Sequence, residues 1–196
     1  MKKTTKILFG TLVLVCLFSR CENKTGTPVS EKSLDFNGFE SQAKWGEHLV
    51  TTSACHDCHT PKKMTPAGPV IDSSLLLAGH MSGTPDPPVD RKVAQGKGLI
   101  ITSDLTTWIG PWGTSYTANL TSDASGIGSW KEEQFIYAIK NGKLKGLAAS
   151  RSLLPPMPWE MYKHFKDEEL KAIFAYLKTT KPVRNIVPAP LPPENQ

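Results

Sequence analysis

Five consecutive residues, Cys55-His56-Asp57-Cys58-His59, carry the clearest chemical signal in this 196-residue chain. Two cysteines separated by two residues and followed directly by histidine form the pattern that attaches haem covalently. Each thiol can form a thioether bond to one vinyl group of the porphyrin, and the imidazole of His59 can bind the iron. The spacing therefore predicts one haem c, attached through Cys55 and Cys58 and ligated by His59.

Other uses of this cysteine pair fit the sequence less well. A structural zinc site needs four protein ligands, and no second Cys/His pair occurs at metal-binding spacing. A thioredoxin-like redox pair belongs in a βαβ unit, which the surrounding residues do not indicate. A disulfide between Cys55 and Cys58 would be strained and would leave His59 without a role.

A haem iron bound by His59 has a second axial position. Methionine suits that position in an electron carrier, because a neutral thioether raises the reduction potential. Met157 lies in Leu153-Leu154-Pro155-Pro156-Met157-Pro158, where prolines fix the backbone and hold a weak ligand with little entropy to lose. We therefore predict Met157 as the second ligand. The alternatives are Met64, Met81, Met161 and His80, together with an open or water-bound position.

Residues 1–20 are predicted to be a signal peptide. Three lysines precede an apolar run over residues 7–18 that is too short to span a membrane. Four of the 23 Lys and Arg residues lie in this segment and no Asp or Glu does, so the rest of the chain is close to neutral. Its charge gives no indication of nucleic-acid binding, which requires a concentrated basic face.

Cys21 follows the signal segment in a context that resembles a bacterial lipobox. Arg20 departs from that pattern, since a small residue is usual before the cysteine. We expect cleavage before Cys21 and its acylation, with residues 21–36 as a polar tether. This predicts a protein on the periplasmic or extracytoplasmic side, lipid-anchored to a bacterial membrane.

One domain over residues 37–188 is expected to follow the tether, with a Pro-rich tail at residues 189–196. The first helix should begin near Asn37 or Ser41 and end near Thr52, because Phe39, Ala43, Gly46 and Val50 form one apolar stripe. This helix would deliver the Cys55–His59 segment to the haem.

Two further helices have recognisable ends. Ser129 and Glu132 fit a capping box, and Asn141-Gly142 fits the end of that helix. The last helix should begin at Asp167 and stop before Pro182.

The region between Thr60 and Ala118 is rich in Pro and Gly and is expected to form long loops around the cofactor. Its residues 99–102 could pair with residues 108–109 or 116–120 in a short β-hairpin.

Several blocks of residues within 45–188 occur in the order typical of small class I cytochromes c. They are His59, Gly68-Pro69, Asn119-Leu120-Thr121, Gly126-Ile127-Gly128-Ser129-Trp130, Leu154-Pro155-Pro156-Met157-Pro158 and residues 167–177. The chain most resembles the haem domains of the cytochrome c subunits that serve membrane-bound alcohol and sugar dehydrogenases. Those subunits commonly carry three such domains, whereas this chain carries one.

The resemblance implies an all-α class I cytochrome c fold, in which the first and last helices cross and Gly46 meets the Tyr176-Leu177 region. It also implies that the Pro69 carbonyl accepts a hydrogen bond from Nδ1–H of His59, which would fix the orientation and basicity of that ligand. Independently of the resemblance, Trp130, Trp159 and Arg151 are candidates for donating hydrogen bonds to the haem propionates.

Together these features predict an exported mono-haem electron carrier and not an enzyme. No catalytic residue or small-molecule substrate is required, since the iron would cycle between ferrous and ferric forms with His59 and Met157 bound. The expected partners are redox proteins and the membrane surface. The alternatives are a haem subunit of a membrane-bound dehydrogenase complex, and a haem peroxidase or gas sensor with an open distal position.

Overall fold

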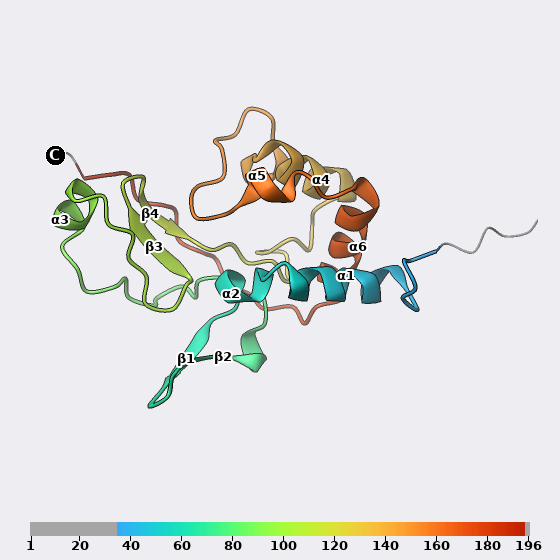
Figure 1. The fold of residues 1–196 in the computed structure, drawn as a ribbon, viewed down its shortest axis with the longest axis horizontal. Helices are drawn as coiled ribbons and strands as arrows, with labels where there is room; N and C mark the ends of the chain where they lie inside the picture. Colours follow the sequence, from blue (N-terminus) through green and yellow to red (C-terminus); the bar gives the residue numbers. More distant parts are fainter. Residues whose placement is uncertain (1–34, 195–196) are drawn as a thin grey trace, which may run out of the picture. The chain divides into compact units, whose positions relative to one another are not determined.

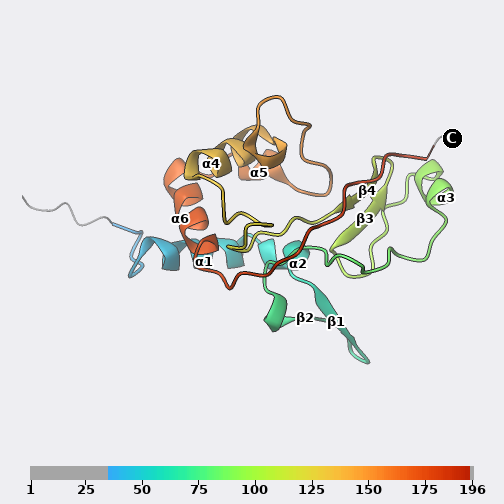
Figure 2. The ribbon, with the colours of Figure 1, turned by 180° about the vertical axis from the view of Figure 1, so that it is seen from behind.

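The computed structural model describes residues 35–194 of the chain. The elements are α1 (Gln42–Thr52), α2 (Cys55–His59), β1 (Lys62–Thr65), β2 (Gly68–Ile71), the short helical turn η1 (Ser73–Leu75), α3 (Arg91–Gly96), β3 (Thr107–Gly110), β4 (Gly113–Tyr116), α4 (Glu132–Asn141), the turn η2 (Leu144–Gly146), α5 (Trp159–Tyr162) and α6 (Asp167–Leu177). Figure 1 and Figure 2 show α1 and α4–α6 together at one end, and α3 with β3 and β4 at the other. Within residues 35–194, no helix is long and apolar enough to cross a membrane.

Helices α1 and α6 cross, as the family resemblance implied. A side chain at Gly46 would collide with the carbonyl of Ala172 and would lie 2.9 Å from Cβ of Tyr176, so only glycine permits this approach. Beside the crossing, Val50 of α1 is fully buried in a core with Leu170, Phe174 and Leu177 of α6. Burial of these aliphatic and aromatic side chains supplies the main stabilisation of this end.

The ends of the helices agree only in part with the predictions. Helix α1 begins after Ser41, whose side chain accepts a hydrogen bond from the Lys44 amide, and it ends at Thr52 as expected. The predicted capping box of α4 is wrong, because the N-cap is Lys131 and makes no side-chain cap hydrogen bond. Gly142 does end α4, with the left-handed φ of 59° that favours glycine there.

Helices form the core, but the fold is not purely helical, so the expected all-α class needs correction. Strands β1 and β2 pair antiparallel, with Lys63 opposite Val70, and β3 pairs with β4. The predicted pairing of residues 99–102 is limited to one bridge, between Ile101 and Ile109. Four-residue strands have too few positions for a clear alternating pattern, which is why the residue patterns of both hairpins are weak.

Candidate functional site

The Cys55–His59 segment forms the short helix α2, which is placed by the end of α1. The chain turns between the two helices at Ala54, which adopts a left-handed conformation with a φ of 57°. The Tyr162 hydroxyl of α5 donates a hydrogen bond of 2.6 Å to the carbonyl of Ser53. The turn and this bond position both cysteines on the wall of one cavity.

Cys55 and Cys58 are half-buried free thiols. Burial raises the pKa of Cys55 to about 11, and burial also raises the pKa of Cys58. A redox-active or nucleophilic pair needs a lowered thiol pKa, so these cysteines lack the property of a thioredoxin-like site. Among residues 35–194, no group of three or more His, Cys, Asp or Glu is placed to hold a metal ion.

His59 is buried, and its ring is oriented by a backbone carbonyl. Its Nδ1 atom lies 2.8 Å from the oxygen of Ala118, so Nε2 is left to face a ligand. Burial lowers the pKa of His59, which favours the neutral imidazole that metals bind. The Ala118 carbonyl acts in the opposite direction, and the nearby Lys62 ammonium lowers the pKa further.

The expected hydrogen bond from His59 to the Pro69 carbonyl is not made. Pro69 lies in β2 opposite Met64, in a hairpin that does not line the cavity. The acceptor is Ala118, which follows β4 and was not recognised from the sequence. A backbone carbonyl leaves no side-chain signature, so no sequence signal could have identified it.

The cavity measures about 880 Å³. It lies within the range of roughly 300–1,000 Å³ that is usual for ligand and cofactor sites. Its lining is mostly apolar and comes from α1 and α2 (Val50, Cys55, Cys58, His59), from residues 115–120, 124–127, 153–158 and 186–190, and from α4 and α6 (Phe135, Ala138, Ile139, Leu170, Ile173, Leu177). A macrocycle that is apolar in its body fits such a site, because burying it removes apolar surface from water.

Met157 lines the same cavity as the two cysteines and His59. Its loop is tied at two points: Leu153 N–H donates to the Gly142 carbonyl at 2.7 Å, and Ser115 Oγ donates to the Pro155 carbonyl at 2.6 Å. The loop therefore combines consecutive prolines with anchors to α4 and β4. A neutral thioether held in this way is suited to bind an iron as a weak axial ligand.

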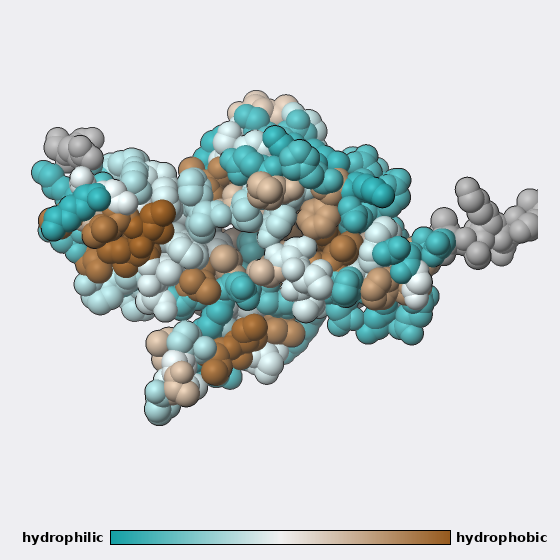
Figure 3. Space-filling view, viewed as in Figure 1, coloured by the Kyte–Doolittle hydropathy of each residue, from teal (hydrophilic) through white to brown (hydrophobic). Residues whose placement is uncertain are grey.

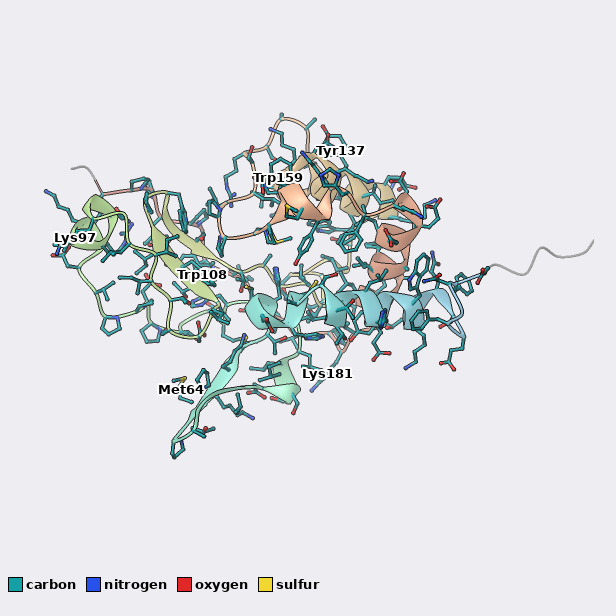
Figure 4. The ribbon with its side chains drawn as sticks, viewed as in Figure 1. Met64, Lys97, Trp108, Tyr137, Trp159 and Lys181 are labelled. Atoms are coloured by element: carbon teal, nitrogen blue, oxygen red, sulfur yellow. The ribbon has the colours of Figure 1, made fainter. Side chains whose placement is uncertain are left out.

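The other predicted alternatives lie elsewhere. Met64 and Met161 are each 69% exposed, and Figure 4 shows Met64 on β1, away from α4 and α5. His80 is buried, with Nδ1 between the hydroxyls of Thr106 and Thr107 at 3.0 and 2.8 Å. Among the methionines of residues 35–194, Met157 is the one that lines the cavity.

Of the three predicted hydrogen-bond donors to the haem propionates, two line the cavity and one does not. Trp130 and Arg151 line the cavity, and burial lowers the pKa of Arg151. Trp159 does not line it; its ring lies against Gly142, where any Cβ would collide with it. Cys21, the predicted lipidation site, lies outside the described residues.

Exposed apolar side chains also gather outside the cavity. Figure 3 shows them over the β1–β2 hairpin and near α3, where Val70, Ile71, Val93 and Ile100 are between 46% and 59% exposed. These two groups lie apart from the cavity lining and were not anticipated from the sequence.

No protein-family model matches the chain. Over 80 residues it is 35% identical to one chain of the nicotinate dehydrogenase of Pseudomonas putida, a match that covers 40% of this chain and 6% of that protein. Over 75 residues it is 39% identical to the fructose dehydrogenase cytochrome subunit of Gluconobacter japonicus, covering 37% of this chain and 15% of the relative.

A longer match is to the cytochrome c subunit of alcohol dehydrogenase (quinone) from Gluconacetobacter polyoxogenes. It is 25% identical over 153 residues, which are 74% of this chain and 26% of that protein. The chain thus spans from 6% to 26% of the length of these three relatives. The predicted resemblance is confirmed at this level: over the second and third of these stretches, the chain is similar to cytochrome subunits of dehydrogenases.

Proposed function

We propose that this protein is a c-type cytochrome that binds one haem through Cys55 and Cys58 and passes single electrons between redox partners. The observation that carries the proposal is the convergence of both thiols, His59 and Met157 on one apolar cavity of about 880 Å³. The similarity to cytochrome c subunits supports the same interpretation. The crossing of α1 and α6 supports a class I arrangement around the haem.

Each of these residues has a definable task in this proposal. Cys55 and Cys58 would hold the haem, each thiol adding its sulfur and its hydrogen across one vinyl group with no net oxidation. His59, held by Ala118, would present a neutral Nε2 to the iron, and Met157 would offer its thioether from the proline-containing loop that lines the same cavity. The bound haem supplies a one-electron couple.

The low polarity of the site would raise the reduction potential of the haem. An apolar wall and a neutral thioether both disfavour the additional charge of ferric iron, which raises the reduction potential. The anchored Pro155-Pro156-Met157 loop keeps its geometry, so electron transfer would require little rearrangement of the protein. Such a site needs no catalytic acid, base or nucleophile.

The test is expression of the full chain in a host that matures c-type cytochromes. We expect one haem per chain that remains bound in denaturant, measured by absorption spectroscopy and intact mass. Cys55→Ser combined with Cys58→Ser should abolish covalent attachment, and His59→Ala should abolish the low-spin spectrum. The matched control is His164→Ala, because His164 is exposed. It should leave both the covalent attachment and the low-spin spectrum unchanged. A colourless wild-type protein would overturn the proposal.

The relatives favour a second, more specific candidate: a cytochrome subunit or partner of a dehydrogenase complex. Fructose dehydrogenase and alcohol dehydrogenase (quinone) each have a cytochrome subunit to which this chain is similar. Affinity purification of the tagged protein from its native membranes should then yield a larger dehydrogenase subunit in stoichiometric amount. Recovery of the cytochrome alone would favour a mobile carrier.

We also propose that the protein is exported and anchored by lipid at Cys21, as the apolar run over residues 7–18 and the following cysteine indicate. The haem would then work on the extracytoplasmic side of the membrane. Cys21→Ala should release the protein from membranes into the soluble fraction, and intact mass should show loss of acyl chains. An unchanged membrane fraction and mass would contradict lipidation.

A further inference from the structure

The chain beyond α6 runs back along the described unit toward α3, as Figure 1 and Figure 2 both show. We call residues 185–194 the C-terminal strap. It begins at Asn185, which is 3% exposed. The Asn185 side-chain amide donates to the carbonyls of Ala78 and His80, both at 2.8 Å, and its oxygen accepts from the Ser82 amide at 3.0 Å. Three hydrogen bonds of this one side chain therefore help to fix the start of the strap.

The middle of the strap is apolar and lines the cavity. Ile186, Val187, Pro188, Ala189 and Pro190 all contribute to the wall. Ile186 is 70% exposed, a high value for a large aliphatic side chain at a cavity lined by other apolar groups. Covering it with an apolar ligand would remove that surface from water. The two prolines lack N–H groups, so this part of the wall offers few hydrogen-bond donors to water.

The far end of the strap is clamped to β4 and α3. Leu191 and Thr114 exchange two backbone hydrogen bonds, of 2.9 and 3.0 Å. The Arg91 guanidinium lies 3.1 Å from the Glu194 carboxylate and donates to the Pro192 carbonyl at 2.9 Å. The Gln95 side chain accepts from the Glu194 amide at 2.9 Å. Helix α3 thus holds this end of the strap through Arg91 and Gln95, although the two segments are far apart in the sequence.

We propose that the strap is a wall of the haem site that excludes water, and that Arg91 is the positioning residue that keeps this wall closed. This inference rests on the proposed function. Exclusion of water from one side of the haem disfavours the ferric charge, so a closed strap would raise the reduction potential. A strap with a purely structural role would affect unfolding but not the potential.

The experiment measures the midpoint potential of the purified holoprotein together with its haem content and spectrum. Arg91→Ala, and a chain ending at Pro190 that keeps the wall residues but lacks the clamped residues, should both shift the potential to lower values with one haem still attached. Arg91→Lys keeps the positive charge opposite Glu194. Its potential should therefore lie between that of Arg91→Ala and that of the wild type. A chain ending at Glu194 keeps every clamp and should match the wild type.

Two control variants and one further test distinguish the role of the wall from effects of charge or of any surface substitution. Lys92→Ala removes the same charge from the neighbouring exposed position, so it shows whether loss of positive charge alone lowers the potential. Ile186→Gln makes the wall polar without touching the clamps, and it should lower the potential. Leu147→Gln changes a side chain that is 55% exposed but does not line the cavity, and it should have no effect.

The outcomes distinguish this inference from the proposed function. An unchanged potential in Arg91→Ala, in the shortened chain or in Ile186→Gln, with haem attached, would overturn the role of the strap. An equal shift in Lys92→Ala and Arg91→Ala would also overturn the role of Arg91 in closing it. If the wild type carried no covalent haem, the proposed function itself would fail. If the clamp variants lost their haem, Ile186→Gln would still decide the question.

Discussion

The Nδ1 atom of His59 lies 2.8 Å from the carbonyl oxygen of Ala118, 59 residues further along the chain. The carbonyl is fixed by its neighbours, because Thr117 N–H donates to the Thr106 carbonyl at 2.9 Å and Leu120 N–H to the Leu77 carbonyl at 2.8 Å. The orientation of the proposed iron ligand therefore depends on the segment that follows β4, and not on the hairpin that follows His59.

This relationship predicts that the β1–β2 hairpin can be shortened without altering the iron site. Residues 64–69 can be replaced by Asn-Gly, which closes a two-residue turn on the paired Lys63 and Val70. We expect unchanged haem attachment and midpoint potential, measured by redox titration. A lowered potential would indicate that the Pro69 carbonyl supports His59 after all.

Substitution of Met157 should alter the iron spectrum. Met157→Ala is expected to remove the weak far-red band of a ferric iron–sulfur bond and to lower the midpoint potential, because water or hydroxide would replace the neutral thioether. Met161→Ala and Met64→Ala are matched controls, since both side chains are 69% exposed and lie outside the cavity lining. Retention of the band in Met157→Ala would exclude Met157 as the ligand.

Ser115 should control how firmly the Met157 loop is held. Loss of the 2.6 Å hydrogen bond from Ser115 Oγ to the Pro155 carbonyl costs about 1–1.5 kcal/mol. Ser115→Ala should therefore raise the affinity of the ferric protein for imidazole, which competes with Met157, by about fivefold to tenfold. The control is Ser152→Ala, in the same region, which should leave the imidazole titration unchanged. Equal affinities for the two variants would contradict the anchoring role.

Two helical glycines should respond in opposite ways to replacement by alanine, because one lies at the helix crossing and the other in open space. Gly46→Ala should lower the free energy of unfolding by about 3 kcal/mol, because the added methyl group collides with the Ala172 backbone. Gly96→Ala in α3 has no heavy atom within 4 Å of the new Cβ, and it should stabilise by about 0.5 kcal/mol. Denaturant unfolding followed by circular dichroism measures both. A Gly46→Ala variant as stable as Gly96→Ala would contradict the close crossing.

Asp72 makes the stability of the β1–β2 region dependent on pH. Hydrogen bonds from the Ser74 side chain, from Lys63 at 3.0 Å and from the Ser74 amide lower the pKa of Asp72 to about 2. The ionised carboxylate is favoured in the folded state. Its contribution is therefore present above the unfolded pKa of about 3.9 and is lost as the pH falls through about 2.

The measurement is the difference in melting temperature between the wild type and Asp72→Asn. We expect the wild type to be more stable above about pH 4 and the difference to vanish near pH 2. Lys63→Met, which removes only the ion pair, should give a smaller difference over a narrower pH range. A difference independent of pH would show that the carboxylate charge does not matter.

The sequence was informative where side-chain type and local spacing determine the structure. The ends of α1 and α6 followed from an apolar stripe and from charged and breaking residues, and their crossing at Gly46 was implied by the family resemblance. The presence of Cys55, Cys58, His59 and Met157 at one cavity agrees with the predicted group, while their bonds to haem remain predictions.

The sequence was uninformative where backbone groups from distant segments meet. The Ala118 carbonyl and the pairing of Thr114 with Leu191 involve main-chain atoms, which every residue carries. The tail at residues 189–196 was expected to be a Pro-rich, extended segment on the surface, and its contacts were not predicted: Leu191 and Glu194 bind β4 and α3. Such contacts depend on tertiary proximity, which local residue patterns do not encode.

The position of the strap in the chain, long after α2, also bears on the order of assembly. A polypeptide is made and translocated from its N-terminus, so α2 emerges long before residues 185–194. The cavity would then be incomplete on that side while the two thiols are first available to a haem-attachment apparatus. Docking of the strap onto Arg91 would then complete the wall of the cavity after the thiols had become available.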